Sequence, residues 1–223
     1  MKTCIIGNSH AGSLLKAVEA LPEGNRPDWD FFVVPNGYRN KAGLKAINHD
    51  AARGAFVDFP YHRSVPDTGA DVVIADYDVF VLVGAHHSVT SIAGMLKQEM
   101  SARFRAAALG EICRATRLYR FAETIRATSS ARILLITRPA PTEPIRATPA
   151  DISLTGAEIA RFWATLDVEL LGQPPATMTP EGLTRVDCLK GDGDQHFTPQ
   201  ASALAVGTLR EALAAPRTLR SSG

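Results

Sequence analysis

The sequence predicts a three-layer α/β/α sandwich with a mainly parallel sheet. Short apolar runs alternate with helical patterns along the chain. Most of these runs are apolar throughout rather than at every second position, as expected of strands that are covered on both faces. The first run also passes through a tight turn directly into a helical pattern, which is typical of a parallel α/β unit.

The first half of the chain supplies three predicted strands. Residues 4–6 form a short apolar run that stops at Gly7, and apolar residues then recur at helical spacing up to residue 21. Further strands are expected at 29–34 and 78–83. The segment between them, residues 38–70, lacks periodicity and holds polar and aromatic side chains, so we expect an irregular binding loop there.

The second half adds the remaining predicted elements. They are a helical region at 95–128 broken at Gly110, a strand at 132–137, a helix at 156–171, a short edge strand at 184–189 and a last helix at 199–214. We expect residues 1–216 to form a single domain and residues 217–223 to be a flexible tail.

Composition excludes several classes of function. The net charge of +1 over 223 residues gives no basic field for nucleic acid or an anionic membrane. The three cysteines lack metal-site spacing and are expected to be buried free thiols, which fits a reducing compartment. Neither a signal peptide nor a membrane-spanning run is apparent. We therefore expect a cytoplasmic protein, and the oligomeric state stays open.

Three segments that carry polar side chains are expected at one edge of the sheet. Ser9 follows the first strand, His86 follows the third, and His196 lies just before the last helix with Asp192 and Asp194 close by. Because the carboxyl ends of parallel strands meet at one edge, these residues are expected to share a cleft. A serine hydroxyl needs an adjacent imidazole base, and the imidazole needs a carboxylate that fixes its tautomer. This set favours nucleophilic acyl transfer.

The same segments resemble the motifs of the SGNH (GDSL-like) hydrolase superfamily. The turn Gly7-Asn8-Ser9 resembles the Gly-Asp-Ser that carries the family's nucleophile, and His196 resembles its histidine before the last helix. The sequence Gly84-Ala85-His86 stands where the family has Gly-x-Asn, and Pro139 closes the fourth strand as a proline does in the family. The family's acid lies three residues before the histidine, where this chain has glycine between Asp192 and Asp194.

The resemblance implies a flavodoxin-like hydrolase fold and an ester hydrolase without metal or cofactor. Ser9 would be the nucleophile, His196 the base, and Asp192 or Asp194 the acid. The oxyanion would be held by the Ser9 backbone N–H, by Gly37 and by His86, with Asn8 as a further binding residue; these assignments all come from the resemblance. The expected substrate is a small acyl ester of a carbohydrate or metabolite.

Other interpretations of these residues stay open. Ser9 would also suit a helix N-cap, and Asp192 and Asp194 between glycines would also suit a turn. The spacing Gly7-x4-Gly12 fits a phosphate-binding loop, but Ser13 stands where that loop needs lysine. An α/β-hydrolase elbow would come later in the chain. The serious alternative is a non-catalytic or weakly active relative that binds a carbohydrate or another ligand.

Overall fold

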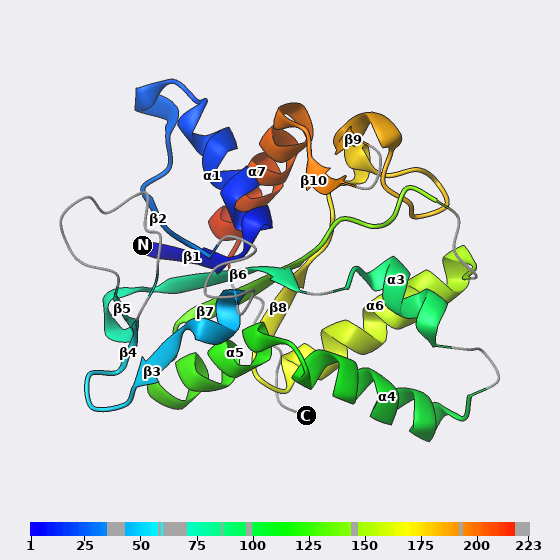
Figure 1. Ribbon diagram of the computed structural model, residues 1–223, viewed down its shortest axis with the longest axis horizontal. Helices are drawn as coiled ribbons and strands as arrows, with labels where there is room; N and C mark the ends of the chain where they lie inside the picture. The colour runs from blue at the N-terminus through cyan, green and yellow to red at the C-terminus, as the bar shows by residue number, and fades with distance from the viewer. Residues whose placement is uncertain are drawn as a thin grey trace.

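The centre of the fold is a five-stranded sheet in the order β2-β1-β6-β7-β8 (Figure 1). The computed structural model describes residues 1–34, 43–57, 59, 71–85, 87–96, 100–143, 147–191 and 194–216, with only the backbone of Gly43, Ala46 and Asp194. The sheet strands are β1 Thr3–Gly7, β2 Trp29–Val33, β6 Val79–Ala85, β7 Arg132–Thr137 and β8 Val168–Leu171.

Every neighbouring pair in this sheet is parallel, so all five carboxyl ends lie along one edge. The strand order changes direction between β1 and β6, because the chain first adds β2 on one side of β1 and then adds the later strands on the other. In open parallel sheets the crevice at such a switch point is the usual place for a ligand. The turn after β1 lies at this point.

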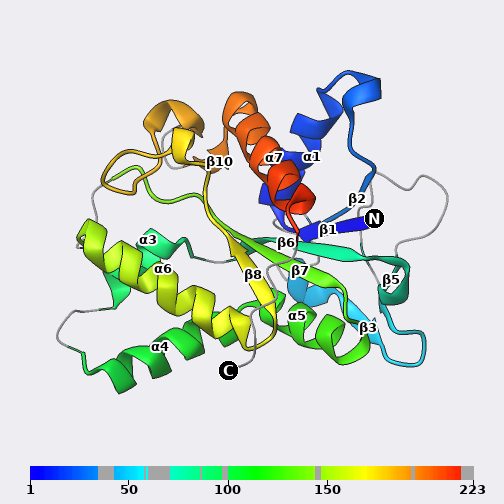
Figure 2. The same ribbon diagram turned by 180° about the vertical axis from the view of Figure 1, so that it is seen from behind.

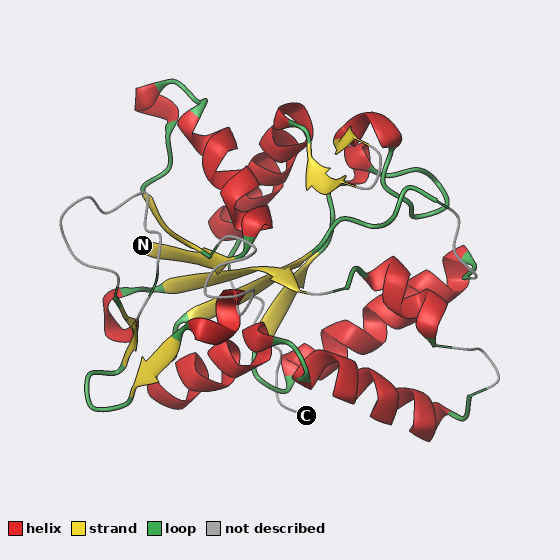
Figure 3. Ribbon diagram, in the orientation of Figure 1, coloured by secondary structure: helices red, strands yellow, loops and turns green. Residues whose placement is uncertain are grey.

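Helices cover both faces of the sheet (Figures 1 and 2). The helices are α1 Ser9–Glu19, α3 Val89–Met95, α4 Ala102–Arg114, α5 Arg117–Thr128, α6 Pro149–Ala164 and α7 Pro199–Ala214. In Figure 3, α1 and α7 lie together on one side and the helices α3 to α6 lie on the other. The predicted three-layer α/β/α architecture is confirmed.

The sheet lies between two hydrophobic cores, because successive side chains along each strand point to opposite faces. On one face Ile5, Val81 and Leu134 are buried under α1 and α7. On the other face Ile6 and Leu82 belong to the larger core, which also takes side chains from α4, α5 and α6. Strands that bury both faces read as continuous apolar runs, which is why the sequence locates them well.

The helix predicted at 156–171 is wrong at both ends. The helix α6 begins at Pro149, where Thr148 and Asp151 form a capping box, and it ends at Ala164. Asp167 then takes a left-handed conformation (φ 53°), and the chain turns directly into β8. Leu170 fits the helical spacing of the sequence but belongs to the fifth strand of the sheet.

Two other boundaries also differ from the prediction. Gly110 lies inside α4, and the break falls at Thr116, whose side chain caps α5 by accepting the Tyr119 N–H. The edge strand predicted at 184–189 is wrong as well, since Thr184 forms only an isolated bridge and the strand begins at Leu189. There β9 Leu189–Gly191 pairs with β10 Asp194–Phe197 in an antiparallel hairpin.

Part of the segment expected to be irregular is ordered as strands. A small antiparallel sheet contains β3 Asn48–Asp50, β4 Ala55–Val57 and β5 Val72–Val73. Phe56 in β4 packs edge-on against Phe121 of α5, with ring centroids 4.7 Å apart. These strands are too short for their alternation to show in the sequence. Short 3₁₀ helices lie at Glu23–Asn25 (η1), Gly43–Ala46 (η2), Ile74–Asp76 (η3), Pro175–Thr177 (η4) and Val186–Cys188 (η5).

The three cysteines are buried and free, as the sequence predicts. Within the part of the chain that the structure describes, no helix combines the length and apolarity that a membrane crossing requires.

Candidate active site

The turn between β1 and α1 presents Ser9 at the switch point of the sheet. Gly7 ends β1, Asn8 is the N-cap residue, and Ser9 is the first residue of α1. A Cβ on Gly7 would lie 2.5 Å from the carbonyl oxygen of Val83 and 2.8 Å from the Cβ of Ala11. Because no real Cβ approaches so closely, only glycine lets β1, β6 and α1 meet here.

Asn8, rather than Ser9, caps the helix. The Asn8 side-chain oxygen accepts the His10 N–H at 3.0 Å, and its amide nitrogen donates to the Gly84 carbonyl oxygen at 3.1 Å. The residue is buried, so both bonds are shielded from water. The Ser9 hydroxyl is therefore not needed for capping, and the Asn8 amide is used in holding β1 and β6 together at the turn.

Gly84 makes this contact possible from the side of β6. It has a φ of +91°, which side chains rarely adopt, and a Cβ there would lie 2.2 Å from Oδ1 of Asn8. The glycine of the Gly-Ala-His segment is thus explained by its close approach to Asn8.

His196 reaches Ser9 from the hairpin near the end of the chain. It lies in β10, after which Thr198 caps α7, the helix that packs beside α1. The His196 Nε2 lies 2.7 Å from the Ser9 Oγ. When the serine hydroxyl donates this bond, the ring proton of the neutral imidazole is on Nδ1. Both residues are partly exposed, so a ligand has access to the pair.

His10 is a member of the site to which the sequence assigned no role. Its ring stacks on the ring of His196, with centroids 4.6 Å apart and an angle of 23° between the planes. It is buried at the second position of α1. The one indication of a role for His10 in the sequence is its position directly after Ser9. Its contact with His196 becomes visible only in the folded structure.

Several predicted site residues lie outside the described part of the chain. Gly37, His86 and Asp192 are among them, and so is the tail 217–223. Of Asp194 the structure describes the backbone alone, as the first residue of β10. The choice between Asp192 and Asp194 as the acid therefore stays a prediction, as do the contributions of Gly37 and His86.

The positive end of a helix points toward Ser9. The first N–H groups of a helix have no partner inside it, and they give its N-terminus a partial positive charge. In α1 the His10 and Ala11 N–H groups are both bound by Asn8. The Ser9 N–H is the first N–H group of α1 and lies beside the Ser9 hydroxyl. It is placed to donate a hydrogen bond to an oxygen that develops negative charge during a reaction.

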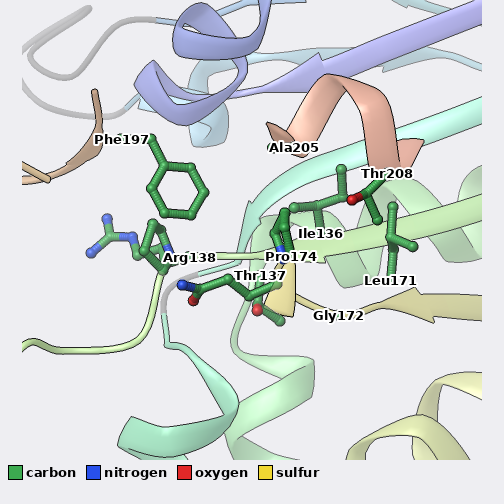
Figure 4. A pocket seen from close by; sticks show the side chains of 11 residues that line it. Ile136, Thr137, Arg138, Leu171, Gly172, Pro174, Phe197, Ala205 and Thr208 are labelled. Carbon is green, nitrogen blue, oxygen red and sulfur yellow. The ribbon is translucent and has the colours of Figure 1, made fainter. Parts of the chain in front are cut away.

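Two pockets lie further along the same edge of the sheet. One is lined by Ile136, Arg138, Leu171, Phe197 and other residues of β7, β8 and α7 (Figure 4). The other contains His87, Cys113 and Trp163 on the opposite face.

Charge and burial perturb the groups that line these pockets. Burial lowers the pKa of Arg138 below its ordinary value. Burial, and secondarily the positive charge of Arg138, lowers the pKa of His87 and so favours its neutral form. Burial raises the pKa of Cys113 to about 11 and keeps it a thiol.

The described residues contain no cluster of three histidine, cysteine, aspartate or glutamate side chains that would hold a metal ion. The chemistry that these residues offer is that of a hydroxyl with an adjacent imidazole and a helix N-terminus. This arrangement suits attack on a carbonyl carbon.

Comparison of the fold finds a similar solved structure, the lipase Lip_vut3 from a goat rumen metagenome. The TM-score is 0.52 at 11% sequence identity, and the match covers 95% of this chain and 97% of the lipase. At this identity the likeness concerns the fold alone, which is a three-layer α/β/α sandwich. No protein-family model and no curated protein matches the sequence.

Proposed function

We propose that the protein is a serine-dependent ester hydrolase of the SGNH type, with Ser9 as nucleophile and His196 as general base. The observation that supports this most is the distance of 2.7 Å between the Ser9 Oγ and the His196 Nε2. The two residues are 187 positions apart in the chain, so the whole fold is needed to join them. A serine that only caps a helix would not need this partner.

In the proposed reaction the Ser9 Oγ attacks the carbonyl carbon of the ester while its proton passes to His196 Nε2. The carbonyl oxygen becomes an oxyanion, which the Ser9 N–H stabilises at the N-terminus of α1. His196 then gives the proton to the leaving alcohol. Water, activated by the same imidazole, releases the acid and restores Ser9.

The remaining roles follow the resemblance of the sequence to the SGNH family. Asp192 or Asp194 would accept a hydrogen bond from His196 and fix its tautomer. Gly37 and His86 would add donors to the oxyanion. The hydrogen bonds of Asn8 support a role for this residue in positioning the turn.

The proposed substrate is a small acyl ester of a carbohydrate or metabolite. Both pockets at the carboxyl edge are small, open to solvent and lined by residues other than Ser9 and His196, so the proposed substrate class rests on the resemblance of the sequence to the family. The similar fold belongs to a protein described as a lipase, which supports ester hydrolysis in general. The three buried free thiols support a reducing, cytoplasmic location.

Hydrolysis of p-nitrophenyl acetate by the native chain and by Ser9→Ala and His196→Ala tests the proposal. Each substitution is expected to lower kcat by several orders of magnitude, because the two groups act as one unit. Ser13→Ala and His49→Ala are matched controls, since Ser13 lies one turn further along α1 and His49 lies in β3. Full activity in Ser9→Ala would refute the nucleophile. A folded native chain that hydrolyses no ester would favour the ligand-binding alternative.

A further inference from the structure

Among the described residues, the arginine that follows β7 has no acidic partner at the edge where Ser9 lies. Among the ion pairs of the described residues, none includes Arg138. Its Nε is shielded from solvent and finds no hydrogen-bond acceptor within the described part of the chain. A shielded N–H without an acceptor is costly, so its presence calls for a reason.

The other end of the same strand shows how this fold satisfies an arginine. Arg132 begins β7 and binds both carboxylate oxygens of Glu169 on β8, at 2.9 and 2.8 Å. That pair is a bidentate fork, the geometry in which a guanidinium binds a carboxylate best. Arg138, at the carboxyl end of β7, has the same fork available for a carboxylate that the described part of the chain does not provide.

The pocket beside Arg138 has apolar walls, and the Arg138 guanidinium lies at its edge, turned away from Ile136 and Leu171 (Figure 4). Figure 4 shows Arg138 and Phe197 on one side of the pocket and Ile136, Leu171 and Thr208 on the other. Gln173, another lining residue, is held in place, since its Oε1 accepts the Ala140 N–H at 2.9 Å. A ligand that occupies this pocket and also reaches the Arg138 guanidinium at its edge would have an apolar part and one anionic group. A carboxylate monoanion fits better than a phosphate dianion, which loses more hydration and would meet only one arginine here.

The pocket lies within reach of the Ser9–His196 pair. Phe197 directly follows His196 in β10, and β7 is separated from β1 by β6 alone. Two strand spacings amount to roughly 10 Å, which an arginine side chain and a short substituent bridge together. Burial and the charge of Arg138 lower the pKa of His87, which disfavours a second positive charge beside Arg138.

We propose that Arg138 binds a carboxylate of the substrate, and that the preferred ester carries this carboxylate on a short arm beside the scissile bond. The inference rests on the proposed ester hydrolysis at Ser9 and names the class of ester. Arg138 then acts as a specificity residue that holds one end of the substrate while the carbonyl lies at Ser9.

Three esters test the inference. They are p-nitrophenyl acetate, which is neutral, mono-p-nitrophenyl succinate, with the carboxylate on the acyl side, and 4-acetoxybenzoate, with the carboxylate on the alcohol side. Arg138→Gln is expected to lower kcat/KM roughly ten- to hundredfold for one of the two carboxylate esters, mainly through KM, and to change acetate hydrolysis less than twofold. Arg138→Lys should restore part of the loss. Arg210→Gln removes an exposed charge from α7 and should affect the three esters equally.

A binding measurement separates this inference from the proposed function. Calorimetry of the native chain with succinate should show binding that Arg138→Gln loses, and dimethyl succinate should not bind. Ser9-dependent hydrolysis with equal effects of Arg138→Gln on all three esters would overturn the inference and leave the function standing. Succinate binding through Arg138 without hydrolysis of any ester would support the carboxylate site at Arg138 but refute the ester hydrolysis, and with it the proposed class of ester. Absence of both succinate binding and any Arg138 effect would overturn the inference.

Discussion

Replacing Asn8 tests the turn that presents Ser9. The side chain of Asn8 makes two buried bonds, one that caps α1 at the His10 N–H and one to the carbonyl oxygen of Gly84. Loss of a helix cap costs about 1 kcal/mol. An acceptor left buried without a donor costs about 1–3 kcal/mol more. Asn8→Ala should therefore lower the free energy of unfolding by about 2–4 kcal/mol.

The substitution Asn8→Asp separates the two contributions. Aspartate caps a helix as well as asparagine does, and its charge suits the N-terminus of α1. It has no N–H for Gly84, however, and turns a carboxylate oxygen toward a carbonyl oxygen. Asn8→Asp should therefore still cost about 1–3 kcal/mol, although it matches the Gly-Asp-Ser of the family that the sequence resembles.

Urea unfolding followed by circular dichroism measures these free energies. The matched control is Ser101→Ala, which removes an exposed cap from α4, where Ser101 accepts the Phe104 N–H at 3.3 Å. This control should cost about 1 kcal/mol or less. The reasoning is refuted if Asn8→Ala costs no more than Ser101→Ala, or if Asn8→Asp is as stable as the native chain.

Three further predictions concern packing, pH and thiol reactivity. Gly7→Ala should unfold the protein or lower its free energy of unfolding by several kcal/mol, because the new Cβ would lie 2.5 Å from a backbone oxygen of β6. The control is Gly207→Ala in α7, where a Cβ meets nothing within 4 Å. This substitution should be neutral or stabilising in the same urea assay. Burial and the charge of Arg138 hold the pKa of His87 below 6.5, so the unfolded chain binds its proton first. Stability should fall as the pH drops from 7 to 5, and His87→Gln should lessen that fall; an unchanged slope would contradict this. A thiol reagent should label the three cysteines only in urea, because all three are buried and the pKa of Cys113 is raised to about 11. Rapid labelling of the native chain would contradict this prediction.

The sequence predicts the central strands because their positions bury both faces, and it predicts the last helix with its observed bounds. It misses β8, because Leu166 and Leu170 also fit helical spacing, and only the left-handed turn at Asp167 diverts the chain into the sheet. That turn depends on the packing of the preceding helix, which a local pattern does not contain.

Part of the candidate site is likewise visible in the sequence. The order of the motifs is sufficient to associate Ser9 with His196, because parallel strands bring their carboxyl ends to one edge. The bond from Asn8 to Gly84 and the stacking of His10 on His196 depend on the register of β1 against β6 and on the path of β10. These contacts between distant segments require the structure.

Covalent labelling with a fluorophosphonate tests the central claim most directly. In this reaction the Ser9 Oγ forms a bond to phosphorus, fluoride leaves, and His196 takes the hydroxyl proton. Mass spectrometry of the native chain should find one adduct, on the peptide that contains Ser9, and Ser13→Ala should be labelled equally. His196→Ala should slow the labelling by orders of magnitude, since the serine then lacks its base. An adduct that persists in Ser9→Ala, or labelling at the native rate in His196→Ala, would contradict the account.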